Sequence, residues 1–150
     1  VLILFGAPPA LVRFTALGCR MVPNREKVLS YGRMAAVSLA GPGMNLLLAG
    51  GMAIFGLEEH PFCTANLVLG ILHSLPVEPL DGGLAFHGLL QLRLSQERAA
   101  KCSFVVSLGI LLPMAVLGFL ILLRTRYNFT LLAMSLYLML YLVLKRDFLS

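Results

Sequence analysis

Tryptophan is absent from the 150 residues, and charged residues make up only 13% of them. A soluble domain of this length has about a quarter charged residues, so an ordinary soluble globular domain is excluded. In place of charge, the sequence is 59% hydrophobic and its mean hydropathy is +0.89. We therefore expect an integral membrane protein, whose length suits a single membrane-embedded domain over residues 1–150.

Cysteine is scarce as well. Cys19, Cys63 and Cys102 are widely spaced and form no C-x-x-C pair. This pattern excludes a disulfide framework and a structural zinc knuckle, so we expect three small hydrophobic side chains in or near helices. Several catalytic motifs are also missing from the sequence, namely H-E-x-x-H, G-x-S-x-G and a glycine-rich phosphate loop.

A nucleic-acid partner is not expected, although the net charge is +5. The basic residues form no dense patch with interleaved aromatic residues. They flank the apolar segments instead, which is where membrane proteins carry them. The lipid bilayer is therefore the first partner that the composition predicts.

Long apolar segments dominate the rest of the chain. The 22 uncharged residues of Met34–Phe55 can cross a hydrocarbon core of roughly 30 Å at ~1.5 Å per residue. We expect an all-α membrane protein with about four transmembrane helices, at Met34–Phe55, Pro61–Leu80, Cys102–Leu123 and Tyr127–Leu144. A polar-faced helix is expected to start at Asp81 and run through Arg98, and Pro113 should kink the third span.

The amino-terminal 33 residues do not make a clean spanning helix. Two short apolar runs, Val1–Phe5 and Leu11–Leu17, flank the turn-forming residues Gly6–Pro9. This pattern predicts a short hairpin or a re-entrant segment, and an amphipathic lead-in is the alternative.

The distribution of basic residues predicts the orientation in the membrane. If residues 1–33 are cytoplasmic, ten basic residues lie inside and two outside, which obeys the positive-inside rule. Both ends of the chain are then cytoplasmic. The inside set is Arg13, Arg20, Arg25, Lys27, Arg33, Arg93, Arg98, Lys101, Lys145 and Arg146, and the outside set is Arg124 and Arg126.

Two carboxylates in Leu75–Gly83 stand out, because a charge at the bilayer centre costs roughly 2.5–3.5 kcal/mol on insertion scales. Asp81 precedes two glycines and can point into a cavity, or it can serve as the N-cap of the following helix. Glu78 is expected to face solvent. Both acids are expected at the cytoplasmic end of the second span, where the cost is smaller.

Histidine offers a second set of candidates. His73 lies inside the second span, where it serves either a functional site or a hydrogen bond between helices. His87 is expected to lie too far along its helix to share a metal with Asp81. His60 belongs to an exposed loop. These residues alone predict a helical membrane protein with buried carboxylates, and they name no reaction.

Two segments together resemble site-2 protease-type intramembrane metalloproteases. Ala40–Leu47, read as Ala-Gly-Pro-Gly-Met-Asn-Leu-Leu, is similar to the Ala-Gly-Pro-x-x-Asn segment of that family. Leu75–Gly83 is similar to its Leu-Pro-x-x-Pro-Leu-Asp-Gly-Gly segment. The regions Ile3–Gly6, Arg93–Lys101 and Tyr127–Leu132 resemble the bacterial branch typified by stage IV sporulation protein FB.

The resemblance implies a zinc metalloendopeptidase that cleaves membrane-anchored protein substrates in a bacterial cytoplasmic membrane, in a sporulation context. It implies that Asp81 is a metal ligand. It also implies that Pro42, Asn45, His73, Pro76 and Gly82 support the site.

The sequence departs from the family at two points. The H-E-x-x-H helix, which carries the other two zinc ligands and the general base, is absent. We therefore expect the carboxy-terminal part of the protease fold, inactive by itself, with no catalytic residue of its own. His73 stands where the family usually has Asn. The alternatives are a non-catalytic paralogue or membrane regulatory subunit, and a small transporter.

Overall fold

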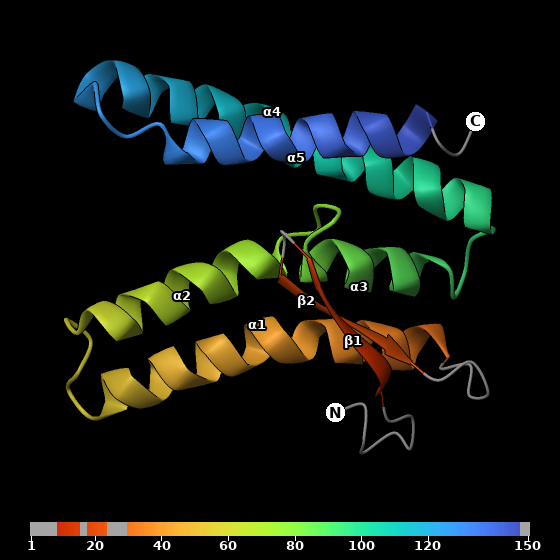
Figure 1. The fold of residues 1–150 in the computed structure, drawn as a ribbon, viewed down its shortest axis with the longest axis horizontal. Coiled ribbons are helices and arrows are strands. Elements are labelled where there is room, and N and C mark those ends of the chain that lie inside the picture. The colour runs from red at the N-terminus through yellow and green to blue at the C-terminus, as the bar shows by residue number, and fades with distance from the viewer. Residues whose placement is uncertain (1–8, 16–17, 24–29, 148–150) are drawn as a thin grey trace.

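A computed structural model describes residues 9–15, 18–23 and 30–147. Two strands precede five helices (Figure 1). The elements are β1 (Pro9–Thr15), β2 (Gly18–Pro23), α1 (Tyr31–Ile54), α2 (Pro61–Ser74), α3 (Asp81–Leu90), α4 (Gln96–Thr125) and α5 (Thr130–Asp147).

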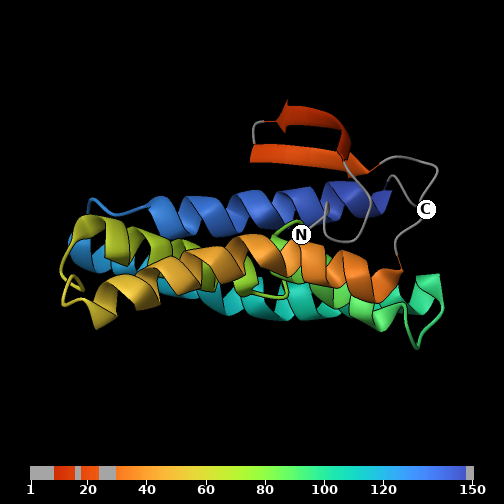
Figure 2. The ribbon, with the colours of Figure 1, turned by 90° about the horizontal axis from the view of Figure 1, so that it is seen from below.

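The helices form two layers. In the first layer, α2 and α3 follow one another along α1, and in the second layer α4 and α5 form an antiparallel pair (Figures 1 and 2). Cys63 of α2 donates a hydrogen bond to the carbonyl of Ala49, near the end of α1. Gly88 of α3 lies against the carbonyl of Tyr31, where α1 begins. The two shorter helices therefore share the length of α1 between them.

The second apolar segment is not a continuous helix, which corrects the predicted span Pro61–Leu80. Helix α2 ends at Ser74, and Leu75 is extended, with φ −63° and ψ 137°. Pro76 explains the break, because a proline disfavours the helical conformation of the residue before it. The 14 residues of α2 make roughly 21 Å of helix, so crossing a membrane requires α2, the 75–80 loop and α3 together.

The helix predicted from Asp81 through Arg98 is two helices. Helix α3 ends at Leu90, and α4 begins at Gln96 after the N-cap residue Ser95. The polar residues near Arg98 thus belong to the first turns of α4. That helix is 30 residues long and contains Pro113.

Two helices, α1 and α4, are long and apolar enough to cross a membrane. Only 11% of the most apolar window of α1 and 17% of that of α4 are buried. Both helices therefore direct most of their apolar residues outward rather than toward a protein core. Exposed large residues on α4 are Val105, Leu112, Val116, Leu117, Phe119, Leu120 and Leu123.

Small and polar residues fill much of the interior instead. Ser103 and Ser107 of α4 and Ser135 of α5 are fully buried. A Cβ on Gly118 of α4 would lie 2.6 Å from the backbone nitrogen of Leu132 in α5. Small residues that let backbones approach closely are typical of helix packing in membranes, so the interior agrees with the outward-facing apolar surface.

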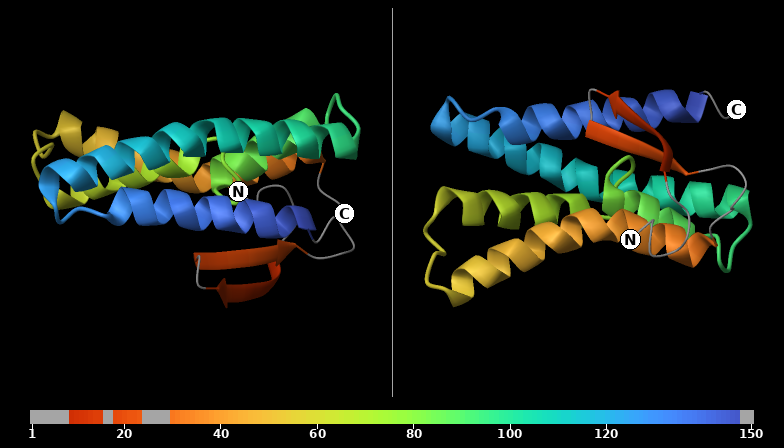
Figure 3. Two further views of the ribbon diagram at one scale, coloured as in Figure 1. Left: turned by 90° about the horizontal axis from the view of Figure 1, so that it is seen from above. Right: turned by 60° about the horizontal axis from the view of Figure 1, so that its bottom comes forward.

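The two strands pair antiparallel, with Arg13 opposite Arg20. β1 overlaps the predicted run Leu11–Leu17, but its partner follows it in the chain, and the residues between the strands are 16 and 17. The predicted first run, Val1–Phe5, lies outside the described residues. Among the described elements the strands contact only each other, and the left view of Figure 3 shows them to one side of the helices.

The two ends of the helical layers differ in charge. Helix α1 begins, the α3–α4 connection passes and α5 ends at one end (Figure 1), which carries Arg33, Arg93, Arg98, Lys101 and Lys145. The opposite end holds the α1–α2 and α4–α5 connections, with Glu58, Glu59, Arg124 and Arg126. The described part of the chain thus has a strongly basic end and a nearly neutral one.

Candidate functional site

The 75–80 loop interrupts the first layer and enters the space between the layers. Val77 is fully buried against Leu111 of α4 and Leu138 of α5. Leu75 and Leu80 pack around the same cluster. The loop is therefore a packed part of the core, and the residues at its ends are held in place by both layers.

Two glycines let the loop lie directly on the first turn of α3. A Cβ on Gly82 would lie 2.3 Å from the carbonyl oxygen of Ser74. A Cβ on Gly83 would lie 2.3 Å from the carbonyl carbon of Val77. No larger residue fits at either position without moving backbone. Steric exclusion therefore explains why two glycines follow Asp81.

Asp81 is the first residue of α3, and the N-cap position belongs to Leu80. The alternative role of Asp81 as N-cap is therefore wrong. Its Oδ2 lies 3.2 Å from Nδ1 of His73, in hydrogen-bond distance. The same oxygen lies 3.7 Å from where a Cβ on Gly41 of α1 would be. Because Gly41 has no side chain, nothing from that position covers the carboxylate.

Asp81 lies beside the middle of α1, not at the end of a span. Gly41 is the eleventh of the 24 residues of α1, and Asp81 faces it. The sequence predicts both acids at the end of a span that closes at Leu80, and the structure corrects that end for Asp81, which lies beside the middle of α1. The difference arises because α3 continues along α1 instead of leaving the layer. The side chains of Asp81 and His73 are 41% and 38% exposed, respectively.

The other predicted supporting residues fall in two places. Pro42 is fully buried inside α1, next to Gly41. Asn45, one turn further along α1, is half-buried, and its side chain makes no hydrogen bond within the described residues. Pro76 belongs to the 75–80 loop, and its carbonyl accepts a hydrogen bond from Ser107 Oγ at 3.5 Å. Gly82 lies in the first turn of α3, against which the loop packs.

Glu78 is buried, which corrects the prediction that it faces solvent. Only 5% of the residue is exposed. Its backbone N–H donates to Ser107 Oγ at 3.1 Å, and its Oε1 accepts a hydrogen bond from Ser103 Oγ at 2.9 Å. A buried carboxylate needs such partners, because an unpaired one is strongly unfavourable.

Two basic groups complete the surroundings of Glu78. Lys145 of α5 donates to Oε2 of Glu78. Nδ1 of His87 in α3 lies 3.2 Å from Oε1 without the alignment of a hydrogen bond. His87 thus lies away from Asp81, as its spacing along α3 predicts, but it has a carboxylate partner that the sequence did not identify.

Sequence reasoning missed this cluster, although two signals for it were present. Ser103 and Ser107 are four residues apart, which places two hydroxyls on one face of a helix. Lys145 lies at the end of an apolar helix, where a lysine is easily read as a simple membrane-end residue. Neither signal names Glu78 as the partner.

The site offers few donors for a metal. Zinc accepts imidazole nitrogen and carboxylate oxygen, and both His73 and Asp81 supply them side by side. Within the described residues, however, no group of three or more His, Cys, Asp or Glu side chains is placed to hold a metal ion. The residues present therefore fit part of a zinc site and not the whole of it.

Comparison of the sequence with protein-family models and with curated proteins yields no match. The resemblance to intramembrane metalloproteases therefore rests on the residues of the two segments alone.

Proposed function

We propose that this chain supplies the aspartate part of an intramembrane zinc metalloendopeptidase that cleaves membrane-anchored protein substrates. Asp81 is the metal ligand in this proposal, and His73 orients its carboxylate. Zinc supplies Lewis-acid activation of water and of the substrate carbonyl when it is bound. The contributions of this chain are to hold the carboxylate in place and to keep one face of it open.

One observation carries the proposal. The two segments that resemble the family are separated by more than 30 residues in the sequence, yet Gly41 of the first faces Asp81 of the second. His73, from a third position, contacts the same carboxylate oxygen. Such a hydrogen bond to a metal-binding carboxylate is a common way to fix its orientation.

The proposed setting is a bacterial cytoplasmic membrane. The chain would cross it four times, through α1, the α2–α3 pair, α4 and α5, with the basic end in the cytoplasm. A sporulation context follows from the resemblance alone. Two further zinc ligands would come from an H-E-x-x-H segment outside these 150 residues, because the sequence contains none.

A second candidate is a non-catalytic paralogue or a membrane regulatory subunit that binds membrane segments without cutting them. The observation that favours it is the donor count, since the described residues bring together two candidate ligands and a catalytic zinc site needs three. On this candidate, Asp81 has no role in metal binding.

A cobalt-binding measurement distinguishes the metalloprotease proposal from the regulatory-subunit candidate. The detergent-purified chain is titrated with Co²⁺ in the presence of a synthetic transmembrane peptide that carries His-Glu-x-x-His, and the visible absorption of the cobalt is recorded. Asp81→Asn should weaken binding more than about tenfold, which is at least the effect of losing a supporting contact to a metal ligand. The matched control is Glu59→Gln, which removes an exposed carboxylate in the connection between α1 and α2 and should change nothing. Equal affinity in the wild-type and Asp81→Asn chains would refute the metal role and favour the regulatory subunit.

A further inference from the structure

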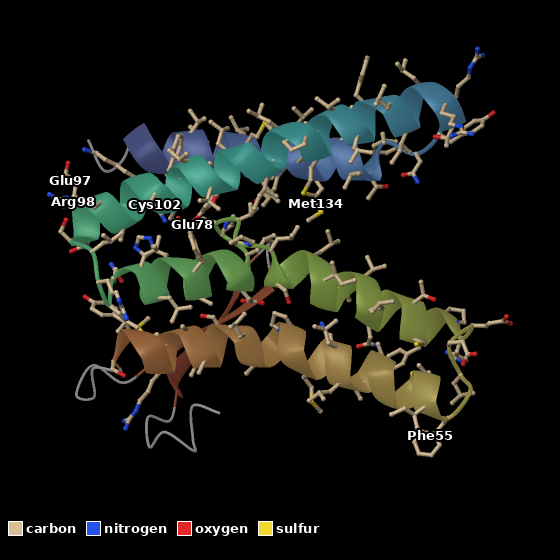
Figure 4. The ribbon with its side chains drawn as sticks, turned by 180° about the vertical axis from the view of Figure 1, so that it is seen from behind. Phe55, Glu78, Glu97, Arg98, Cys102 and Met134 are labelled. Atoms are coloured by element: carbon tan, nitrogen blue, oxygen red, sulfur yellow. The ribbon has the colours of Figure 1, made fainter. Side chains whose placement is uncertain are left out.

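Glu78 has no part in the proposed metal site, yet it is among the most thoroughly bonded side chains of the described structure. Its side chain is 7% exposed. Its two carboxylate oxygens accept hydrogen bonds from Ser103 and Lys145, and its backbone N–H donates to Ser107. Figure 4 shows Glu78 in the space between the first layer and α4.

These partners come from both helices of the second layer. Ser103 and Ser107 belong to α4 and Lys145 to α5, whereas His87, beside Oε1, belongs to α3 of the first layer. Among the described elements, neither α1 nor α2 packs against α4 or α5. The layers are therefore joined through α3 and through the 75–80 loop. Glu78 makes the polar contacts of that loop with the second layer, together with the hydrogen bond from Ser107 to the carbonyl of Pro76.

The loop backbone connects Glu78 to the first turn of α3, which carries Asp81. The backbone of Val77 and Glu78 lies on Gly83 so closely that a Cβ there would be 2.5 Å from the Glu78 nitrogen. Gly83 is two residues from Asp81 on the first turn of α3. No side chain separates the loop from that turn, so the backbone of the loop lies directly against the start of α3.

We infer that Glu78 is a positioning residue, which anchors the loop to α4 and α5 and thereby holds Asp81 against the middle of α1. The functional meaning of this inference rests on the proposed metal role of Asp81. Its structural content, the distance between residues 81 and 41, does not.

Disulfide trapping measures that distance directly. Gly41→Cys and Asp81→Cys are introduced into a chain whose native cysteines are replaced by serine, and the rate of oxidative crosslinking is followed in detergent. Adding Glu78→Gln or Lys145→Met should slow the crosslink at least about tenfold. Lys145→Met leaves the buried Glu78 carboxylate without its cation, and Glu78→Gln removes the charge that pairs the loop with the partly exposed Lys145. Lys145→Arg keeps the charge and should restore the rate. Glu97→Gln is the matched control, because it breaks an exposed ion pair with Lys101 on α4 and should leave the rate unchanged.

A second crosslink distinguishes a local displacement of Asp81 from unfolding of the whole chain. Cys63 donates to the carbonyl of Ala49, so a separate chain that keeps Cys63, with the other native cysteines replaced by serine and Ala49→Cys added, reports a crosslink between α1 and α2, away from the loop. Glu78→Gln should leave this crosslink unchanged. The inference is overturned if the 41–81 rate does not fall, and equally if both rates fall together, because Glu78 would then support the fold as a whole. Asp81 is absent from the trapping variant, so the result does not depend on metal binding. Failure of the cobalt experiment would leave this inference standing.

Discussion

At the scale of single residues, the two acids of the 75–83 region have separate environments. Asp81 is partly exposed and has one histidine beside it, whereas Glu78 is buried and bonded to groups from two helices. Partial exposure leaves lone pairs of Asp81 free for a ligand, whereas burial and a hydrogen bond to each carboxylate oxygen close Glu78 to one. Their surroundings therefore favour a binding role for Asp81 and an anchoring role for Glu78.

The close contact between the loop backbone and Gly83 gives a prediction at the same scale. Gly83→Ala should lower the stability by about 2–4 kcal/mol, because the new Cβ meets backbone that cannot move without displacing Val77 from the core. Thermal unfolding in detergent, followed by circular dichroism, measures the change. The matched control is Gly50→Ala in α1, where a Cβ meets nothing within 4 Å and helix propensity should add roughly 0.5–1 kcal/mol. Equal stability of the two variants would show that the loop does not need this contact.

At the scale of elements, small residues decide which helices pair. Gly70 of α2 lies under Leu46 of α1, and Gly118 of α4 lies under Leu132 of α5. Apolar side chains gain little by leaving lipid for protein, so helices in a membrane associate through close van der Waals packing. The glycines and buried serines thus do in this chain what large apolar residues do in a soluble core.

Gly118→Val tests this account for the α4–α5 pair. The added side chain should push the helices apart and cost about 1–3 kcal/mol, as overpacking of an interior does, because its Cβ would lie 2.6 Å from backbone nitrogen. Reversible unfolding by a denaturing detergent measures the loss. Gly109→Val, on the same helix and with open space around it, should have a small effect. If the two valine variants lose the same stability, close approach at Gly118 is not what holds the pair.

At the scale of the whole molecule, the 75–80 loop places α2 and α3 one after the other along α1 (Figure 1). The 14 residues of α2 are too short to cross a hydrocarbon core alone, so the proposed four passes count α2 and α3 as one. That proposal puts the connections near Glu59 and Arg126 on one side of the membrane and the α3–α4 connection on the other.

Labelling of single cysteines checks that arrangement. In sealed membrane vesicles, cysteines at Glu59 and Arg126 should react with an impermeant maleimide from the same side, and a cysteine at Gln96 should react from the opposite side. The basic end should be cytoplasmic, because positive charge favours that side. Labelling of Glu59→Cys and Gln96→Cys from the same side would contradict four passes.

The chain is expected to be inactive by itself. Incubation of the reconstituted 150-residue protein with zinc and a membrane-anchored peptide should give no cleavage, because the described residues bring together only two candidate ligands. Mass spectrometry of the peptide is the measurement. Specific cleavage that disappears in Asp81→Asn would show that the chain holds a complete site.

The sequence by itself determined the features that depend on short stretches. Hydropathy sums over neighbouring residues, so the apolar helices α1, α4 and α5 were predicted to within a few residues of their ends, apart from the start of α4. The end of α2 at Ser74 was not predicted, although Pro76 carries a local signal for it, because a proline disfavours the helical conformation of the residue before it.

Only the tertiary structure decided the environment of the two acids. Glu78 is buried because of Ser103 and Lys145, which lie 25 and 67 residues away in the chain, and Asp81 lies at the middle of α1 because α3 packs along that helix. Burial and charge pairing depend on which distant segments meet, and no local pattern contains that information. The structure therefore separated an anchoring glutamate from an accessible aspartate, which the sequence showed only as neighbours.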